Sequence, residues 1–254
     1  MALHVVEAGE GPPVVLLHGL TATHRYVVMG SKALERGGHR TIAYDARGHG
    51  ASDPGDGYGY DALCADLIAV LDERGLDRAV LAGASMGAHT ALRLALHAPE
   101  RVAGLVVITP AHHPDAPRDL DRWDRLAHGL RTGGVDGFVE AYGEPTGPWA
   151  ETITKVVRQR LGAHEHPAAV ADALEQVPRS DPFDLADLAQ VRAPTVVVAD
   201  RDEPDPGHPL FVGEEYARRI PGARLVVEEP GQSPIAWQGS RLSKVIAGVV
   251  AEAA

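Results

Sequence analysis

Short apolar runs that are typical of β-strands alternate with longer segments of helical periodicity along most of the chain. The runs cover residues 3–7, 14–17, 40–44, 79–82, 105–108, 195–199 and 224–227, and helical patterns fill 27–36, 62–74, 88–97, 214–219 and 240–253. Strands that are joined by helices pair in parallel when each helix crosses a face of the sheet. The pattern therefore predicts an α/β fold, a mostly parallel sheet of about seven strands with helices on both faces.

One interval breaks this alternation. Between Thr109 and Pro194 the sequence shows helical patterns at 119–130, 135–142, 150–161 and 168–177, and no convincing strand pattern. An interval of roughly 80 residues is far longer than an ordinary crossover. We therefore expect a helical cap over residues 111–189, inserted into a core formed by residues 1–110 and 190–254.

The segment Gly83-Ala84-Ser85-Met86-Gly87 lies between the run 79–82 and a helical stretch. A G-x-S-x-G pattern at a strand–helix junction is a nucleophile elbow, in which a strained turn lifts the serine oxygen above the sheet edge. The same turn aims the backbone N–H of Met86 at a developing oxyanion. We predict Ser85 as a nucleophile in an outlier backbone conformation.

Two further segments carry a family resemblance. His18-Gly19-Leu20 follows the run 14–17, and residues 45–53 read D-A-R-G-H-G-A-S-D. Together with the elbow they resemble the α/β-hydrolase fold nearly end to end, although the first strand of that fold has no counterpart here. The resemblance implies an oxyanion hole made by the Leu20 and Met86 amides. It also implies that Asp202, after the run 195–199, is the acid of a Ser-Asp-His triad.

The histidine of that triad is missing from its usual place. The resemblance puts it in a Gly-His step after the last strand, where this chain has Gly231-Gln232, and no histidine follows His208. A glutamine amide forms hydrogen bonds but carries no proton at neutral pH. Three explanations stand open: an engineered change, a base displaced to another histidine, or a protein that no longer performs triad hydrolysis. We expect Gln232 within hydrogen-bond reach of Asp202 or Ser85.

A displaced base has to lie at the carboxyl edge of the sheet, where open α/β sheets place their sites. His208 follows Asp202 by six residues in the proline-braced segment Asp205-Pro206-Gly207-His208-Pro209 and is the first choice. His113, at the entrance to the expected cap, is the second choice. For each of the two, the alternative is an ordinary packed or surface histidine with no catalytic role.

Other site residues are less sharply defined. Aromatic side chains near the loops or the cap that are candidates to line a substrate cavity are Tyr26, Phe138, Tyr142, Trp149 and Trp237. His164 and His166 have a spacing that sometimes binds metal, but Pro167 follows them and a solvated loop is the expected reading. No G-x-G-x-x-G pattern opens a helix, so the sequence indicates neither NAD nor FAD, and we expect no metal or other cofactor.

Composition narrows the class of protein. Lys plus Arg total 24 against 35 Asp plus Glu, a formal net charge of −11, which argues against nucleic acid as a partner. No apolar run reaches the length of a membrane span, and the first residues lack the pattern of a signal peptide. The single cysteine, Cys64, cannot form an intrachain disulfide and is compatible with a reducing cytoplasm.

The leading hypothesis is a cofactor-free serine hydrolase of a small, rather apolar ester, lactone or related acyl compound. A non-catalytic relative that uses the capped cavity as a receptor or carrier is the first alternative. The second is a lyase or isomerase that needs only the oxyanion hole. The sequence fixes neither the substrate nor the oligomeric state.

Overall fold

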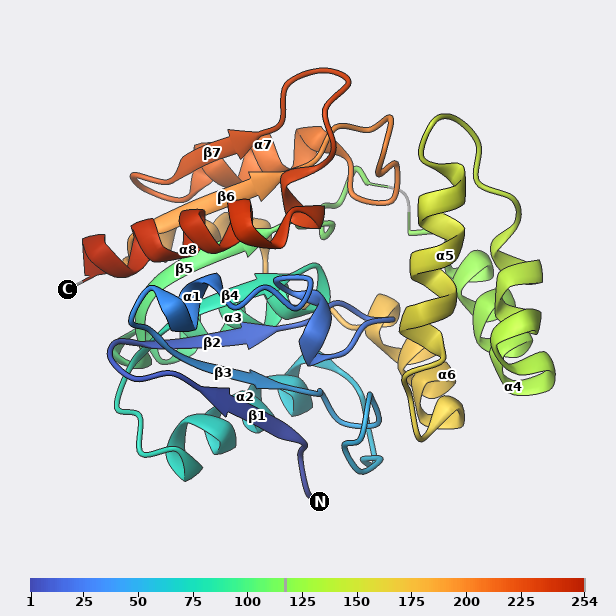
Figure 1. Cartoon of the computed structure of the whole chain (residues 1–254), viewed down its shortest axis with the longest axis horizontal. Helices are drawn as coiled ribbons and strands as arrows, with labels where there is room; N and C mark the ends of the chain where they lie inside the picture. Colours follow the sequence, from blue (N-terminus) through green and yellow to red (C-terminus); the bar gives the residue numbers. More distant parts are fainter. Residues whose placement is uncertain (117, 254) are drawn as a thin grey trace.

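A computed structural model describes residues 1–116 and 118–253. Its sheet has seven strands in the order β1-β3-β2-β4-β5-β6-β7 (Figure 1). The strands are β1 (Val5–Ala8), β2 (Pro13–Leu17), β3 (Arg40–Tyr44), β4 (Ala79–Ala84), β5 (Val102–Ile108), β6 (Thr195–Ala199) and β7 (Arg224–Val227). Only β1, at one edge, runs antiparallel to its neighbour, β3, so the predicted mostly parallel sheet is confirmed.

Both faces of the sheet are buried, and successive side chains of each strand serve opposite faces. In β2, Val15 and Leu17 pack with the side chains of α2 (Tyr60–Glu73), α3 (Met86–His97) and α7 (Leu210–Arg219). Val14 and Leu16 pack with α1 (Ala33–Arg36) and α8 (Gly239–Ala253) on the other face. This double burial explains why the strand sequences are continuously apolar rather than alternating.

Between β5 and β6 the described residues form helices and no strand. These helices are α4 (Leu120–Tyr142), α5 (Ala150–Leu161) and α6 (Pro167–Gln176), which stand together beside the sheet in Figure 1. Their apolar side chains share one buried cluster with Leu20, Tyr60 and Met86 of the core. The cap helices thus cover the loops at the carboxyl ends of the strands, and the exact domain boundaries remain a prediction.

One predicted helix is shorter in the structure, because the pattern over 27–36 yields only the four residues of α1. The two helices predicted at 119–130 and 135–142 are both present within α4, which is interrupted at Gly134 by φ 58° and ψ −143°. Glycine tolerates that non-helical conformation, so the first helical segment ends there and the second begins.

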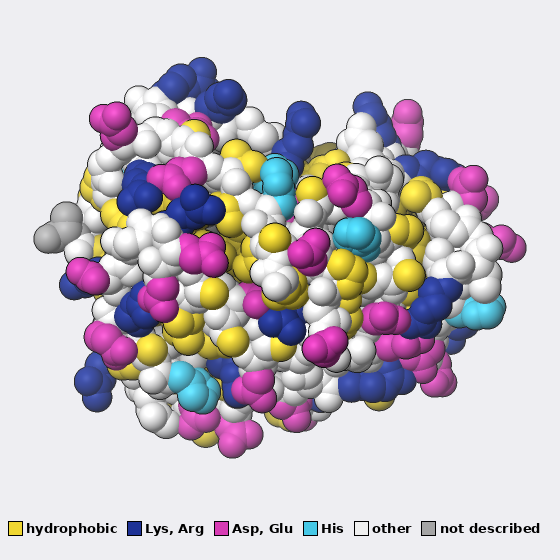
Figure 2. All heavy atoms as spheres, turned by 90° about the horizontal axis from the view of Figure 1, so that it is seen from below, with side chains coloured by type: hydrophobic (Ala, Val, Ile, Leu, Met, Phe, Trp, Pro, Cys, Tyr) yellow, Lys and Arg dark blue, Asp and Glu magenta, His cyan; other side chains and the backbone are white. Residues whose placement is uncertain are grey.

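The surface agrees with the mixed charge of the sequence. On the face drawn in Figure 2, acidic and basic side chains lie intermixed. Within the described residues, none of the helices combines the length and the apolar character that a membrane crossing requires.

Candidate active site

Ser85 occupies the sharp turn between β4 and α3, with φ 50° and ψ −110°. This positive φ is a strained conformation for a residue with a Cβ, as the elbow predicts. The flanking glycines are required, because a Cβ on Gly83 would lie 2.2 Å from the Gly87 carbonyl oxygen. A Cβ on Gly87 would lie 2.3 Å from the Leu17 carbonyl oxygen. The turn therefore packs too closely against β2 to accept any larger residue.

The His18-Gly19-Leu20 turn lies directly beside this elbow. A Cβ placed on Gly19 would approach the Ser85 Cβ to 3.6 Å. Met86 is the first residue of α3, so its N–H has no partner within the helix. Leu20 and Met86 are both buried next to the serine, and their role as oxyanion donors stays a prediction.

His208 lies against Ser85. Its Nε2 is 3.0 Å from the Ser85 Oγ, and its Nδ1 is 2.9 Å from the nearer carboxylate oxygen of Asp205. With the ring neutral, Nδ1–H donates to Asp205 and the serine hydroxyl donates to Nε2. The structure thus brings together a serine, an imidazole and a carboxylate in the order that nucleophilic catalysis needs.

Electrostatics favour the same arrangement. Burial alone disfavours the charged imidazole, but the negative charge and hydrogen bond of Asp205 raise the pKa of His208 above its ordinary value. Asp200 lies deeper and is fully buried directly after β6. Burial together with the charges of Asp205 and Glu228 raises the pKa of Asp200 to about 8, so this carboxyl is largely protonated at neutral pH.

The carboxylate beside the imidazole is Asp205, and the prediction that Asp202 holds this place is wrong. Asp202 is exposed, and its Oδ1 accepts a hydrogen bond of 2.7 Å from the N–H of Leu210 at the start of α7. The reason is local, because the N–H of His208 donates to the carbonyl of Asp205 and closes a turn. Asp at the first and Pro at the second position favour such a turn. The D-P-G-H pattern could therefore have predicted Asp205 as the partner of His208, but the family resemblance pointed to Asp202 instead.

Gln232 does not occupy the site either. Its side chain is exposed and forms no hydrogen bond to Asp202 or Ser85 among the described residues. Its backbone N–H closes a turn onto the Glu229 carbonyl, and Gly231 adopts φ 76° within that turn. The turn directs Gln232 to solvent, so the expected contact is wrong.

His113, the second choice for the base, lies elsewhere. Its ring packs edge-on against Phe211, and its Nδ1 accepts a hydrogen bond from the N–H of Asp115. It lines a surface groove of about 350 Å³ with Phe211 and residues of α7, and no contact with Ser85 is found within the described chain.

Of the predicted aromatic residues, Phe138 and Tyr142 stack on each other within α4 of the cap, and the other three lie between the cap and the core. Trp149 of the cap and Trp237, from the loop after β7, meet edge to face with ring centroids 5.7 Å apart. Tyr26 lies under the guanidinium of Arg160, a cap residue that the sequence analysis did not single out. Both contacts join the cap to core loops, and whether these rings bind substrate stays a prediction.

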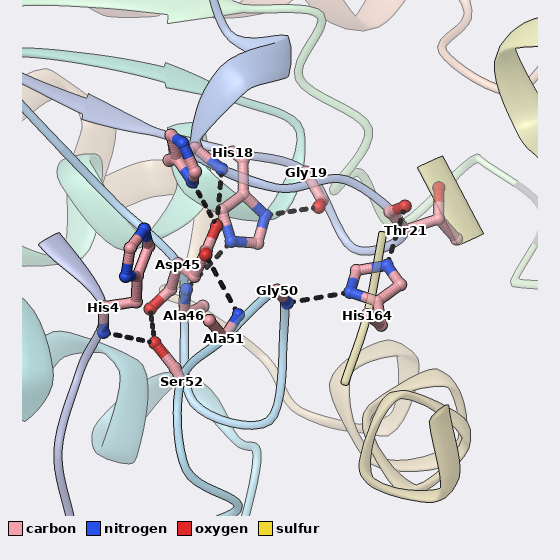
Figure 3. Close-up of polar contacts among 11 residues, drawn as sticks. His4, His18, Gly19, Thr21, Asp45, Ala46, Gly50, Ala51, Ser52 and His164 are labelled. Atoms are coloured by element: carbon pink, nitrogen blue, oxygen red, sulfur yellow. Dashed lines mark hydrogen bonds and ion pairs between the residues drawn. The ribbon is translucent and has the colours of Figure 1, made fainter. Parts of the chain in front are cut away.

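The loop 45–53 holds the His18-Gly19-Leu20 turn and the cap in place (Figure 3). His18 accepts a hydrogen bond from the Ala46 N–H through Nε2 and donates to the Gly19 carbonyl through Nδ1. Across the cap boundary, the Gly50 N–H donates to His164 Nδ1 at 2.8 Å. Burial first, and then the neighbouring His49, lower the pKa of His164 to about 4, so it docks as a neutral acceptor. Its role is therefore a cap contact and not a solvated loop.

One group of side chains has the donor atoms of a metal site. His4, His24 and Asp45 place ligand atoms within 4.8 Å of one another. His24 already hydrogen-bonds to Asp45 through both its backbone N–H and its Nδ1. Burial would raise the pKa of Asp45, but these hydrogen bonds lower it to about 2. These hydrogen bonds explain why His24 and Asp45 lie together, since they hold the loop in place without a metal ion.

Comparison with known proteins identifies the family of the chain. Residues 12–148 match the α/β hydrolase fold family. A Pseudomonas putida enzyme, 2-hydroxy-6-oxononadienedioate/2-hydroxy-6-oxononatrienedioate hydrolase 2, is 30% identical over 241 residues, which are 89% of this chain and 83% of that protein. The AB hydrolase superfamily protein YisY of Bacillus subtilis is 34% identical over 144 residues, 56% of this chain and 52% of YisY, so the match spans about half of YisY.

Among solved structures, a thermophilic esterase from Thermogutta terrifontis is similar, with a TM-score of 0.80 and 27% identity. The matched region covers 99% of this chain and 93% of the esterase chain. The chain belongs to the α/β hydrolase fold family. It is a hydrolase of that superfamily, as these relatives are named.

Proposed function

We propose that the protein is a serine hydrolase that cleaves a small ester or lactone with a displaced triad, Ser85–His208–Asp205. The observation that carries the proposal is the pair of contacts at His208, 3.0 Å to the serine oxygen and 2.9 Å to the Asp205 carboxylate. Of the three explanations for Gln232, this one keeps hydrolysis and moves the base to the loop after β6.

The chemistry follows from these positions. Ser85 Oγ attacks the acyl carbon while His208 Nε2 takes the serine proton, and Asp205 stabilises the imidazolium that forms. The negative charge of the tetrahedral intermediate develops on the former carbonyl oxygen, where the amides of Leu20 and Met86 donate. His208 then returns the proton to the leaving alkoxide, and a water molecule repeats the sequence to release the acid. No metal or organic cofactor is needed for these steps.

The location of the triad favours a small substrate. The cap packs on the core beside Leu20 and Met86, in one continuous apolar cluster. A compact acyl compound fits such a covered site better than a polymer, since capped α/β sites enclose their ligands.

The test is the reactivity of the serine. A fluorophosphonate probe should label Ser85 in the native protein, and mass spectrometry of the labelled peptide identifies the site. His208→Ala should lower labelling and the hydrolysis of an aryl acetate by about 10²-fold or more, the usual worth of a positioned general base. His113→Ala is the matched control, because His113 packs on Phe211 away from the serine. A His208→Ala variant that retains full activity would exclude the proposed base.

A further inference from the structure

Arg160 projects from the cap toward the core loops that surround the serine. It lies near the end of α5, the cap helix that stands next to the core in Figure 1. Its guanidinium carbon is 5.3 Å from the centroid of the Tyr26 ring. Tyr26 lies six residues beyond Leu20, on the loop that continues from the proposed oxyanion turn. The side chain therefore crosses from the cap to the active-site side of the core.

Arg160 differs from several other cap arginines in its partners. Arg131, Arg158 and Arg179 each form an ion pair with an acidic side chain of the cap. Within residues 1–116 and 118–253, Arg160 has no carboxylate within ion-pair distance. Its Nε is buried and lacks a hydrogen-bond partner among those residues. Arg160 as a whole is half-buried, but a buried N–H donor without a partner costs free energy, and such a donor is retained most readily where a ligand completes it.

Arg160 interacts electrostatically with two members of the proposed triad. Burial lowers the pKa of Arg160, and the negative charge of Asp205 works against that effect. In the other direction, Arg160 is one of the groups that lower the pKa of His208. Because Asp205 is already engaged by His208, the donors of the guanidinium remain available to another anion.

We propose that Arg160 is a carboxylate-binding group of the active site. The preferred substrate is then an ester or lactone that carries a second, free carboxylate away from the acyl carbon that Ser85 attacks. A guanidinium presents parallel N–H donors that match the two oxygens of a carboxylate, which a neutral group of similar size cannot reproduce. The inference rests on the hydrolase proposal and adds a charged end to the small, rather apolar substrate expected from the sequence.

The competing role is a structural contact that fixes the cap through Tyr26. Such a contact would influence every substrate alike, because it acts on the cap and not on the ligand. Selectivity between a charged and a neutral substrate of one shape separates the two roles.

The experiment compares two aryl esters of adipic acid, one with the distal carboxylate free and one with that group as the primary amide. The wild-type protein should prefer the carboxylate ester in kcat/KM by about tenfold or more, the usual effect of a charged bidentate contact. Arg160→Gln should bring the ratio close to one, and Arg160→Lys should keep part of it. Arg158→Gln, two residues away and paired with Asp136, is the matched control and should leave the ratio unchanged.

The outcomes separate this inference from the hydrolase proposal. Equal use of both esters by the wild type, or an equal loss on both in Arg160→Gln, overturns the carboxylate site and leaves the hydrolase proposal intact. If neither ester is cleaved and the fluorophosphonate does not label Ser85, the hydrolase proposal fails. Calorimetric titration with adipate then decides the inference: binding that Arg160→Gln abolishes supports the site, and identical isotherms reject it.

Discussion

The two halves of the proposed site are held by different means. On the serine side, the elbow is fixed by glycines that touch backbone atoms and by a buried hydrogen bond from Ser85 N–H to the Ile108 carbonyl. On the base side, His208 and Asp205 are partly exposed and are joined by one turn of four residues. A side chain supplied by an exposed turn can be replaced by a neighbour, whereas a backbone elbow packed against another strand cannot. In the proposed triad, this difference accounts for a base that has moved while the nucleophile has kept its place.

The largest effect should come from breaking the serine side. Gly87→Ala would bring a Cβ to 2.3 Å from the Leu17 carbonyl oxygen. Relieving that overlap must shift β2 or α3, so we expect a loss of about 3 kcal/mol in the free energy of unfolding and no measurable hydrolysis. Urea denaturation and an ester assay measure both.

Gly133→Ala is the matched control, because Gly133 is also helical and a Cβ there meets nothing within 4 Å. Its unfolding free energy should stay equal or rise by up to about 1 kcal/mol. A Gly87→Ala protein as stable and active as Gly133→Ala would show that the elbow is not tightly constrained.

On the base side, Asp205→Asn and Asp202→Asn distinguish the two acids. Asp205→Asn should lower kcat/KM by about 10²–10⁴-fold, because the asparagine no longer stabilises the imidazolium. Asp202→Asn changes only the contact to Leu210 and should cost less than about tenfold. The reverse order of effects would return the acid to the position implied by the family resemblance.

The pH profile of any activity left in Asp205→Asn sharpens this test. A general base must be neutral, so activity falls as pH drops through the pKa of His208. Asp205 raises that pKa, and removing its charge should move the acidic limb of kcat/KM to lower pH. A limb that stays in place would mean that Asp205 does not act on the base.

The sequence predicted the serine side of the proposed site better than the base side. Local patterns of apolar and small residues determine the seven strands, the elbow at Ser85 and the neighbouring turn at Gly19. Such local patterns can be recognised in the sequence alone.

Asp205 was missed although it lies in the same four-residue turn as His208, because the family pattern pointed to Asp202 instead. Arg160 was missed because its contact with Tyr26 joins two segments that are far apart in the sequence. Asp202 was misplaced because the family pattern was carried over to a loop in which the D-P-G-H turn brings Asp205 to the histidine. Gln232 was misplaced because a second turn, from Glu229 to Gln232 after β7, directs it to solvent.

The cap contact at His164 predicts a smaller, pH-dependent effect on stability. Its pKa is lowered to about 4 in the folded state, against about 6.5 in an unfolded chain. The unfolded state therefore gains a proton first, so stability is full above pH 6.5 and falls as the pH drops from there toward 4. We expect about 2 kcal/mol or less from this residue, since it is partly exposed.

His164→Gln removes the titrating group, and its amide oxygen can still accept from Gly50. The unfolding free energy of this variant should vary less between pH 7 and 4 than that of the wild type, as measured by chemical denaturation at a series of pH values. Parallel curves for the two proteins would exclude His164 as the source.

The smallest effect is expected where the family places its histidine. Gln232 is exposed and contacts neither Ser85 nor Asp202 within the described chain, so Gln232→His should change kcat/KM by less than about tenfold while His208 is present. The informative protein is the double variant His208→Ala with Gln232→His. If the loop after β7 can no longer reach the serine, the double variant stays as inactive as His208→Ala alone. Recovery of activity by orders of magnitude in the double variant would mean that position 232 can still supply a base to Ser85.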